Sequence, residues 1–244
     1  MKKLFKSRQT KFGFTLVEMA IVLAIVALLL AGLLPTISSQ IEQQRRNETR
    51  KQLAEIQQAL MGFAIMNGRL PCPMSATITN PSNAGYGMEA ASCSANQASE
   101  GFLPWKTLGV SETDAWGNKR TSTSSPWTGY WRYRTDRNFS NIASPITLNT
   151  GFGTCPGANI DCLVIQDNGG NSLTLAAERP IAIVYSTGPN LVSDGQNATF
   201  HPDGSTAPGA TYQSDVPAAG FDDILVWISR PQLFNRMVAA GKLP

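Results

Sequence analysis

A single carboxylate, Glu18, lies near the start of a long apolar segment, and this setting determines what it can do. It follows the stretch Lys11-Phe12-Gly13-Phe14-Thr15-Leu16-Val17, and sixteen apolar residues, Met19 to Leu34, come directly after it. A carboxylate at the centre of an apolar span costs about 2.5–3.5 kcal/mol on insertion scales, less near an edge, and such a residue generally has a functional partner. The sequence therefore predicts a paired charge at Glu18. A glutamate that snorkels to a membrane interface is the alternative.

The apolar segment is long enough to cross a bilayer. Phe14 to Leu34 is 21 residues, and polar side chains interrupt it only at Thr15 and Glu18. A helix rises ~1.5 Å per residue, so this length matches the ~30 Å hydrocarbon core. Five basic residues and no acidic residue precede it. The positive-inside rule then predicts one membrane span with a cytoplasmic N-terminus, and places everything after Leu34 across the membrane.

Four cysteines, Cys72, Cys93, Cys155 and Cys162, form an even set beyond this span. In an oxidising compartment an even set predicts two disulfides, for which three connectivities exist. We expect the sequence-local pairing, Cys72–Cys93 and Cys155–Cys162. Zinc is the alternative, disfavoured because the chain has no C-x-x-C pair and only one histidine, His201.

The charge balance excludes other classes of function. The formal net charge is +3, but residues 1–13 hold five of the 20 basic residues, which leaves 15 against 17 acidic residues, a net charge of −2. A basic patch for nucleic acid is therefore not indicated. One histidine and no G-x-S-x-G motif leave no catalytic set, so we expect no enzymatic activity; a membrane-anchored periplasmic enzyme is the least favoured alternative.

The segment around Gly13 resembles the class III leader of type IV pilins and of type II secretion pseudopilins. It joins a glycine, an aromatic residue, a lone glutamate and an apolar run in the order that those families share. The resemblance implies that a prepilin peptidase/N-methyltransferase removes leader residues 1–13 by cutting after Gly13 and methylates the new N-terminal Phe14. It also implies that Glu18 pairs with the Phe14 amine of a neighbouring copy within a fibre.

A single helix is predicted from Phe14 to about Asn67. Its first half, residues 14–35, is apolar all round, and its second half, residues 36–68, becomes amphipathic. Pro35 lies at the junction, where a missing backbone donor predicts a kink or local unwinding. The apolar stripe recurs at intervals of three and four residues, at Leu53, Ile56, Leu60 and Phe63.

Residues 69–244 are predicted to form one periplasmic globular domain. Residues 69–100 show no periodicity and indicate a long loop clipped by a disulfide. Four strands are predicted, at Gly129–Thr135, Cys162–Gln166, Ile181–Thr187 and Ile224–Ser229, followed by a short helix between Ser229 and Gly241. The expected fold class is α+β and pilin-like, with the long helix packed on a small antiparallel sheet.

A second resemblance covers the C-terminal half of the chain. Four segments are similar in order to major type II secretion pseudopilins: Asp114-Ala115-Trp116-Gly117-Asn118, Tyr130-Trp131-Arg132-Tyr133, Val184-Tyr185-Ser186-Thr187-Gly188 and Phe221-Asp222-Asp223-Ile224. The chain departs from the pattern at Ala115, which replaces a proline, in the inserted residues 119–129, and at Pro189-Asn190, which replaces an Ala-Asp pair. In that family an acidic loop holds calcium, and the matching positions are Asp194, Asp222 and Asp223. A solvated turn is the alternative, because turns also favour Asp and Gly.

These features together predict a structural subunit of a type IV pilus or a type II secretion pseudopilus. The expected partners are other pilin or pseudopilin subunits, the prepilin peptidase and an inner-membrane assembly platform. The expected location is the bacterial inner membrane and then a periplasmic or extracellular fibre. The chain is longer than a typical major subunit, which favours a minor one. The alternative is a minor pilin that acts as a binding module through loops 72–100 and 190–220, since loops on a rigid scaffold carry such functions.

Overall fold

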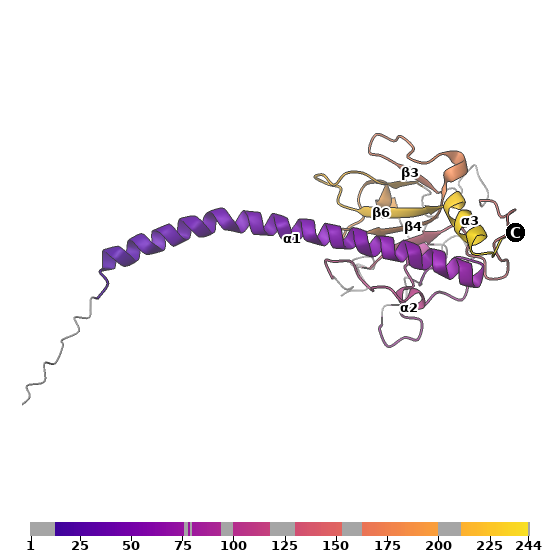
Figure 1. Ribbon diagram of the computed structural model, residues 1–244, viewed down its shortest axis with the longest axis horizontal. Coiled ribbons are helices and arrows are strands. Elements are labelled where there is room, and N and C mark those ends of the chain that lie inside the picture. The colour runs from indigo at the N-terminus through magenta and orange to yellow at the C-terminus, as the bar shows by residue number, and fades with distance from the viewer. Residues whose placement is uncertain are drawn as a thin grey trace, which may run out of the picture. The chain divides into compact units, whose positions relative to one another are not determined.

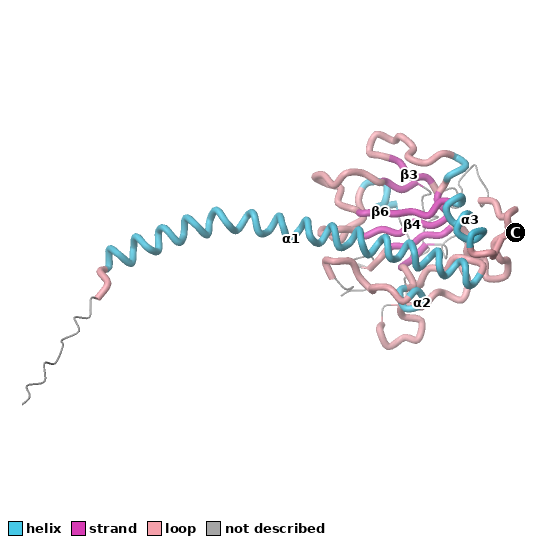
Figure 2. Tube along the Cα trace, in the orientation of Figure 1, coloured by secondary structure: helices cyan, strands magenta, loops and turns pink. Residues whose placement is uncertain are grey.

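The computed structural model describes residues 13–75, 78, 80–93, 100–117, 130–152, 163–199 and 211–243. Two α-helices lie at the ends of this part of the chain, and short strands and loops lie between them (Figures 1 and 2). The elements in chain order are α1 (Leu16–Asn67), β1 (Glu100–Phe102), α2 (Trp105–Leu108), β2 (Arg132–Thr135), β3 (Val164–Gln166), η2 (Ala176–Glu178), β4 (Pro180–Ser186), η3 (Gly195–Thr199), β5 (Thr211–Gln213), β6 (Ile224–Ser229) and α3 (Arg230–Ala239).

Helix α1 confirms the prediction of one long N-terminal helix. It runs for 52 residues and ends at Asn67, directly before Gly68, which adopts a left-handed φ of 69°. The helix passes through Pro35 without a break, so the local unwinding expected there is not observed. Among the residues that the structure describes, no helix is long and apolar enough to cross a membrane, and the expected span over residues 14–35 is therefore not supported.

The chain divides into two compact units, Met1–Gln44 and Arg45–Pro244. The first unit contains the N-terminal part of α1, where the side chains of residues 13–31 are all exposed. The second unit contains the rest of α1 and the globular domain.

The globular domain is built on a four-stranded antiparallel sheet in the order β1-β2-β4-β6. Strand β4 is central: Val184 lies opposite Tyr133 of β2 on one side and Val226 of β6 on the other. All seven residues of β4 are buried. Complete burial requires that both faces of the sheet be covered, because neighbouring side chains on a strand point to opposite faces.

The C-terminal part of α1 covers one face of this sheet. Its buried stripe packs in one cluster with β2, β4 and β6, and α3 contributes to the same cluster beside the end of α1 (Figure 1). Gln57 also donates a hydrogen bond of 2.7 Å from Nε2 to the carbonyl oxygen of Trp227 on β6. The buried apolar residues of the helix are Leu53, Ile56, Leu60, Met61 and Ala64. The predicted packing of the helix on an antiparallel sheet is thus confirmed.

A second, two-stranded sheet covers the other face. Strands β3 and β5 pair in parallel, with Ile165 opposite Tyr212, and both residues pack against Ile183 and Tyr185 of β4. This pair was not predicted, and it explains why β4 is buried throughout. The domain therefore has three layers: helix, antiparallel sheet and the β3–β5 layer.

Candidate functional site

The N-terminal end of α1 is closed by a reciprocal pair of hydrogen bonds between Thr15 and Glu18. Glu18 N–H donates to Thr15 Oγ1 (3.2 Å), and Thr15 N–H donates to Glu18 Oε2 (2.9 Å), which also accepts from Thr15 Oγ1 at 3.0 Å. This is a capping box, and it explains why the helix begins at Leu16. None of these bonds uses Glu18 Oε1. Sequence reasoning missed the role of Thr15, although the pattern Thr-x-x-Glu was the signal for it.

The expected cleavage point lies just outside this cap. Gly13, Phe14 and Thr15 precede α1 and are not helical, and all three are exposed. The side chain of Phe14 is 79% exposed, and large apolar side chains continue exposed along the first half of α1. This part of the helix therefore presents both an accessible Gly13–Phe14 bond and an apolar surface in need of a covering partner.

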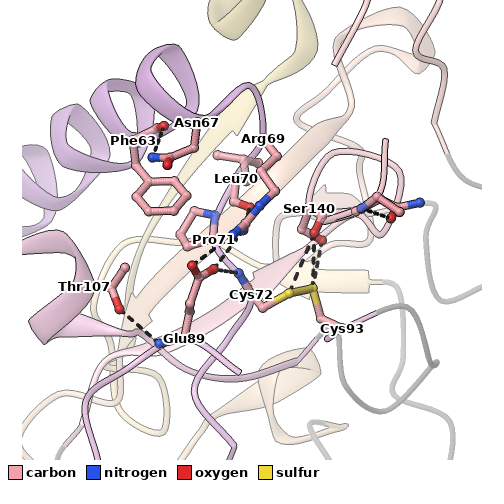
Figure 3. Close-up of polar contacts among 12 residues, drawn as sticks. Phe63, Asn67, Arg69, Leu70, Pro71, Cys72, Glu89, Cys93, Thr107 and Ser140 are labelled. Carbon is pink, nitrogen blue, oxygen red and sulfur yellow. Dashed lines mark hydrogen bonds and ion pairs between the residues drawn. A yellow bond between two sulfur atoms is a disulfide. The ribbon is translucent and has the colours of Figure 1, made fainter. Parts of the chain in front are cut away.

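The first predicted disulfide, Cys72–Cys93, is present, and a half-buried ion pair lies beside it. Glu89 accepts from both Arg69 Nη1 (2.8 Å) and Arg69 Nη2 (2.9 Å), and its Oε2 also accepts from the N–H of Cys72 at 3.1 Å (Figure 3). The N–H of Glu89 donates to Thr107 Oγ1 at 3.0 Å. These contacts hold the start of the loop after α1 against Glu89, and the bond to Thr107 joins the loop to α2. Cys155, Cys162 and His201 lie outside the described residues.

Two of the motif segments found in the sequence meet in the structure. Asp114 is buried, and its Oδ2 accepts a short hydrogen bond from Ser186 Oγ, which in turn accepts from the N–H of Gly188 at 3.1 Å. Burial raises the pKa of the Asp114 carboxyl group. Gly188 has a left-handed φ of 62°, and a Cβ at this position would overlap the Asp222 carboxylate. Asp114 and Ser186 thereby position the turn that leads to the acidic residues.

The structure brings together the three predicted metal ligands, Asp194, Asp222 and Asp223. One carboxylate oxygen from each lies within 4.8 Å of the others. The two segments are linked by hydrogen bonds from backbone to carboxylate: the N–H of Asp194 donates to Asp223 Oδ2 at 3.0 Å, and the N–H of Asp222 donates to Asp194 Oδ2 at 2.9 Å. Asp223 is only 3% exposed. The site is therefore formed by two segments that are distant in sequence: Asp194 lies 28 residues before Asp222 and 29 residues before Asp223.

Burial and mutual repulsion change the acidity of this cluster. Burial, with a contribution from the neighbouring Asp194 carboxylate, raises the pKa of Asp222 to about 6. Burial raises the pKa of Asp223 to about 7, against the opposing effect of its hydrogen bonds from Asp194 and Asn197. Three carboxylates this close are costly when all are ionised and no cation is bound.

Two asparagines, neither of them predicted to have a role in the site, hold these carboxylates. Asn190 Nδ2 donates to both oxygens of Asp194, at 3.2 and 3.1 Å. Asn197 Nδ2 donates to Asp223 Oδ2 at 2.8 Å. Asn190 is one of the residues at which the chain departs from the pseudopilin pattern that it resembles, and its amide stands where that pattern has a carboxylate.

The donor set suits a hard cation. Asp222 Oδ1 and Asp223 Oδ1 are both buried, and neither has a hydrogen-bond partner among the described residues. Buried carboxylate oxygens without a partner carry a large desolvation cost. Calcium takes six to eight oxygen ligands from carboxylates, carbonyls and water. These orphaned oxygens therefore fit a calcium ion, which would satisfy them and offset the repulsion.

Comparison with known proteins identifies one part of the chain. Residues 8–34 match the prokaryotic N-terminal methylation motif. The match contains Gly13, Phe14 and Glu18, and it supports the similarity of the N-terminal segment to the precursors of type IV pilins and pseudopilins. No curated protein and no solved structure matches the chain.

Proposed function

We propose that this chain is a structural subunit of a type IV pilus or a type II secretion pseudopilus. The observation that carries the proposal is the match of residues 8–34 to the N-terminal methylation motif, which coincides with an exposed cleavage segment and an exposed apolar helix. Pilin-type proteins are structural, and we assign no catalytic role to this one. Its 244 residues exceed the length of a typical major subunit, so we assign it a minor or specialised position.

In this proposal a prepilin peptidase cuts after Gly13 at the inner membrane, and the same enzyme methylates Phe14. A protease must bind its substrate in an accessible, non-helical form, and residues 13–15 meet this requirement. The basic leader and the apolar run of the sequence support a topology with the leader on the cytoplasmic side and the globular domain in the periplasm, although the structure shows no membrane-spanning helix among the described residues. Lipid covers the apolar side chains of the precursor until the assembly platform transfers it to the fibre.

In the fibre, the first half of α1 packs against the same segment of other subunits. Full burial of a large apolar side chain stabilises by about 1.5–3 kcal/mol, and many such side chains are exposed on this segment. Glu18 pairs with the Phe14 amine of an adjacent copy, which neutralises both charges away from water and fixes the axial register. Because a subunit at the very tip has no copy above it, the retention of Glu18 favours a position below another subunit.

Cleavage after Gly13 is tested by measuring the intact mass and the N-terminal sequence of the full chain, expressed together with a type IV assembly system. We expect a chain that starts at methylated Phe14. Gly13→Val should retain residues 1–13, whereas Gly62→Ala should be processed normally; a Cβ has open space at both glycines, so neither change is expected to disturb the fold. A wild-type chain that keeps its leader, or one cut beyond Leu34, would contradict the proposal.

The second part of the proposal is a calcium site at Asp194, Asp222 and Asp223. The supporting observation is the pair of buried, unpartnered oxygens on Asp222 and Asp223. When bound, calcium would supply positive charge that holds all three carboxylates ionised. This would fix the loop at residues 190–197 to the start of β6. Isothermal titration of the full chain with calcium should show one site, which Asp223→Asn should weaken strongly; the absence of heat with the wild-type protein would contradict the site.

A further inference from the structure

Asn197 has a buried side chain whose amide oxygen and amide nitrogen both form hydrogen bonds. It is 1% exposed. Its Oδ1 accepts from the N–H of Gln213 at 2.9 Å, and its Nδ2 donates to the carbonyl oxygen of Gln213 at 3.1 Å. The side-chain amide thus bonds to both backbone groups of one residue, as a neighbouring strand would.

Gln213 is the last residue of β5, and β5 belongs to the β3–β5 layer. This layer covers one face of the central sheet through Ile165 and Tyr212. Strand β5 has three residues, so the two bonds to Asn197 are a large part of its attachment at this end. Asn197 is also held to the acidic segment by its backbone, because its N–H donates to the carbonyl oxygen of Asp194 at 2.9 Å.

The same amide reaches the carboxylate cluster. Asn197 Nδ2 donates to Asp223 Oδ2 at 2.8 Å, while Asp223 Oδ1 is buried and without a partner among the described residues. One oxygen of Asp223 is therefore tied to β5 through Asn197, and the other remains to bind a cation. Two side chains, Asp223 and Asn197, therefore connect the proposed calcium ion to Gln213 of the β3–β5 layer.

We propose that Asn197 is a positioning residue that couples calcium occupancy to the attachment of the β3–β5 layer. The inference rests on the calcium site of the proposed function. A cation bound at Asp223 Oδ1 fixes the position of this carboxylate, and so holds its Oδ2 within hydrogen-bond distance of Asn197 Nδ2. Calcium therefore strengthens the tether from Asp223 through Asn197 to Gln213. Because coupling is reciprocal, loss of the tether weakens calcium binding by the same factor.

The test uses the full chain in detergent and calcium chloride as the probe. Hydrogen exchange of residues 211–214 is measured in wild-type protein with calcium and with chelator, and calcium affinity is measured for the wild type, Asn197→Ala and Asn138→Ala. We expect chelation to accelerate exchange at Gln213 by about 5- to 150-fold. We expect Asn197→Ala to weaken calcium binding about 10- to 100-fold, as losses of residues that orient metal ligands do. Asn138, whose Nδ2 donates to the exposed carbonyl oxygen of Gly151, is the matched control and should leave affinity unchanged.

Each outcome decides a separate question. If the wild type binds calcium but exchange in β5 is the same with and without it, the coupling is overturned and the calcium site stands. If the wild type does not bind calcium, the site and the coupling both fall. The exchange measurement needs no variant, so it decides the matter even if Asn197→Ala does not fold.

Discussion

At the scale of single residues, burial determines the chemistry of Asp223. This carboxyl group is 3% exposed and accepts hydrogen bonds at one oxygen only. Its pKa is raised to about 7 and that of Asp222 to about 6, whereas an ordinary Asp titrates near 3.8. In the absence of a cation, the folded chain therefore binds more protons than the unfolded chain from about pH 4 to about pH 7.

This difference predicts how stability depends on pH. A group whose folded pKa is raised contributes stability that is present below its unfolded pKa and lost as the pH rises through the folded value. We expect the free energy of unfolding in chelator to fall as the pH rises from about 4 to about 7. Asp223→Asn should remove much of this slope and stabilise the chelated protein at pH 8 by about 1–3 kcal/mol, since an amide can donate to its acidic neighbours.

Denaturant unfolding at a series of pH values measures this effect. Asp167→Asn serves as the control: Asp167 is half-buried, and hydrogen bonds from Asn171 lower its pKa, so its loss should leave the fall in stability up to pH 7 in place. Calcium should oppose the fall, because it binds the ionised carboxylates. If the free energy of unfolding falls equally with pH in the wild type and in Asp223→Asn, the raised pKa of Asp223 is not its cause.

At the scale of elements, the attachment of α1 depends on its buried stripe. Ile56 is fully buried against the sheet, whereas Met66 on the same helix is 79% exposed. We expect Ile56→Ala to lower the free energy of unfolding by about 2–5 kcal/mol through lost burial and the cavity left behind. Met66→Ala should change it by about 0.5 kcal/mol or less. Urea unfolding monitored by tryptophan fluorescence distinguishes the two variants. Equal losses of stability would contradict the burial of Ile56 against the sheet.

The loop after α1 offers a second test, because its ion pair differs from an exposed one. The Arg69 and Glu89 side chains are 14% and 23% exposed, against 67% and 62% for Lys51 and Glu55. We expect Glu89→Gln to destabilise by about 1–3 kcal/mol, since it breaks charge-assisted bonds in a desolvated setting. Glu55→Gln should cost about 0.5 kcal/mol or less.

Whether the pair and the disulfide act together can be measured with a double-mutant cycle. Cys72 and Cys93 close a loop with a sequence separation of 21, and such a bridge is worth about 3 kcal/mol. If Glu89 holds the loop in the geometry of the bridge, Glu89→Gln and a Cys72→Ser/Cys93→Ser variant should show a coupling energy of about 0.5 kcal/mol or more. Additive losses would mean that the two restraints act independently.

The elements predicted from sequence are those with a local signal. Helix α1 followed from its apolar stripe and its Asn67-Gly68 end, and β6 was predicted with its observed bounds, Ile224–Ser229. Strands β1 and β5 have three residues each and lie in no apolar run, so they were missed. Strand β3 is equally short, but it overlaps the apolar run Leu163-Val164-Ile165 and was predicted. Strand β5 exists through its parallel pairing with β3, a contact between distant segments that no local pattern reveals.

In the candidate site too, only the features with a signal in the sequence could be predicted. Its acidic residues were found from a resemblance in sequence, but their convergence within 4.8 Å depends on the loops before η3 and β6. Asn190 was noted only as a departure from the pseudopilin pattern, and Asn197 carried no signal for this site, since asparagine is common in any turn. The buried link between Asp114 and Ser186 joins segments 72 residues apart, so only the folded chain shows that the two motifs support one turn.

At the scale of the whole molecule, the proposed fibre depends on whether the charge of Glu18 or its role as a helix cap matters. Glu18→Gln separates these roles, because glutamine at this position also completes a capping box but cannot pair as an anion with the Phe14 amine. We expect Glu18→Gln to be processed after Gly13 and to retain its helix, yet to be lost from fibres. Thr15→Ala removes the cap at a cost of about 1 kcal/mol and keeps the charge, so it should still enter fibres. Quantitative immunoblotting of the sheared fibre and membrane fractions measures both; Glu18→Gln present in fibres at the wild-type level would show that Glu18 caps the helix and takes no part in assembly.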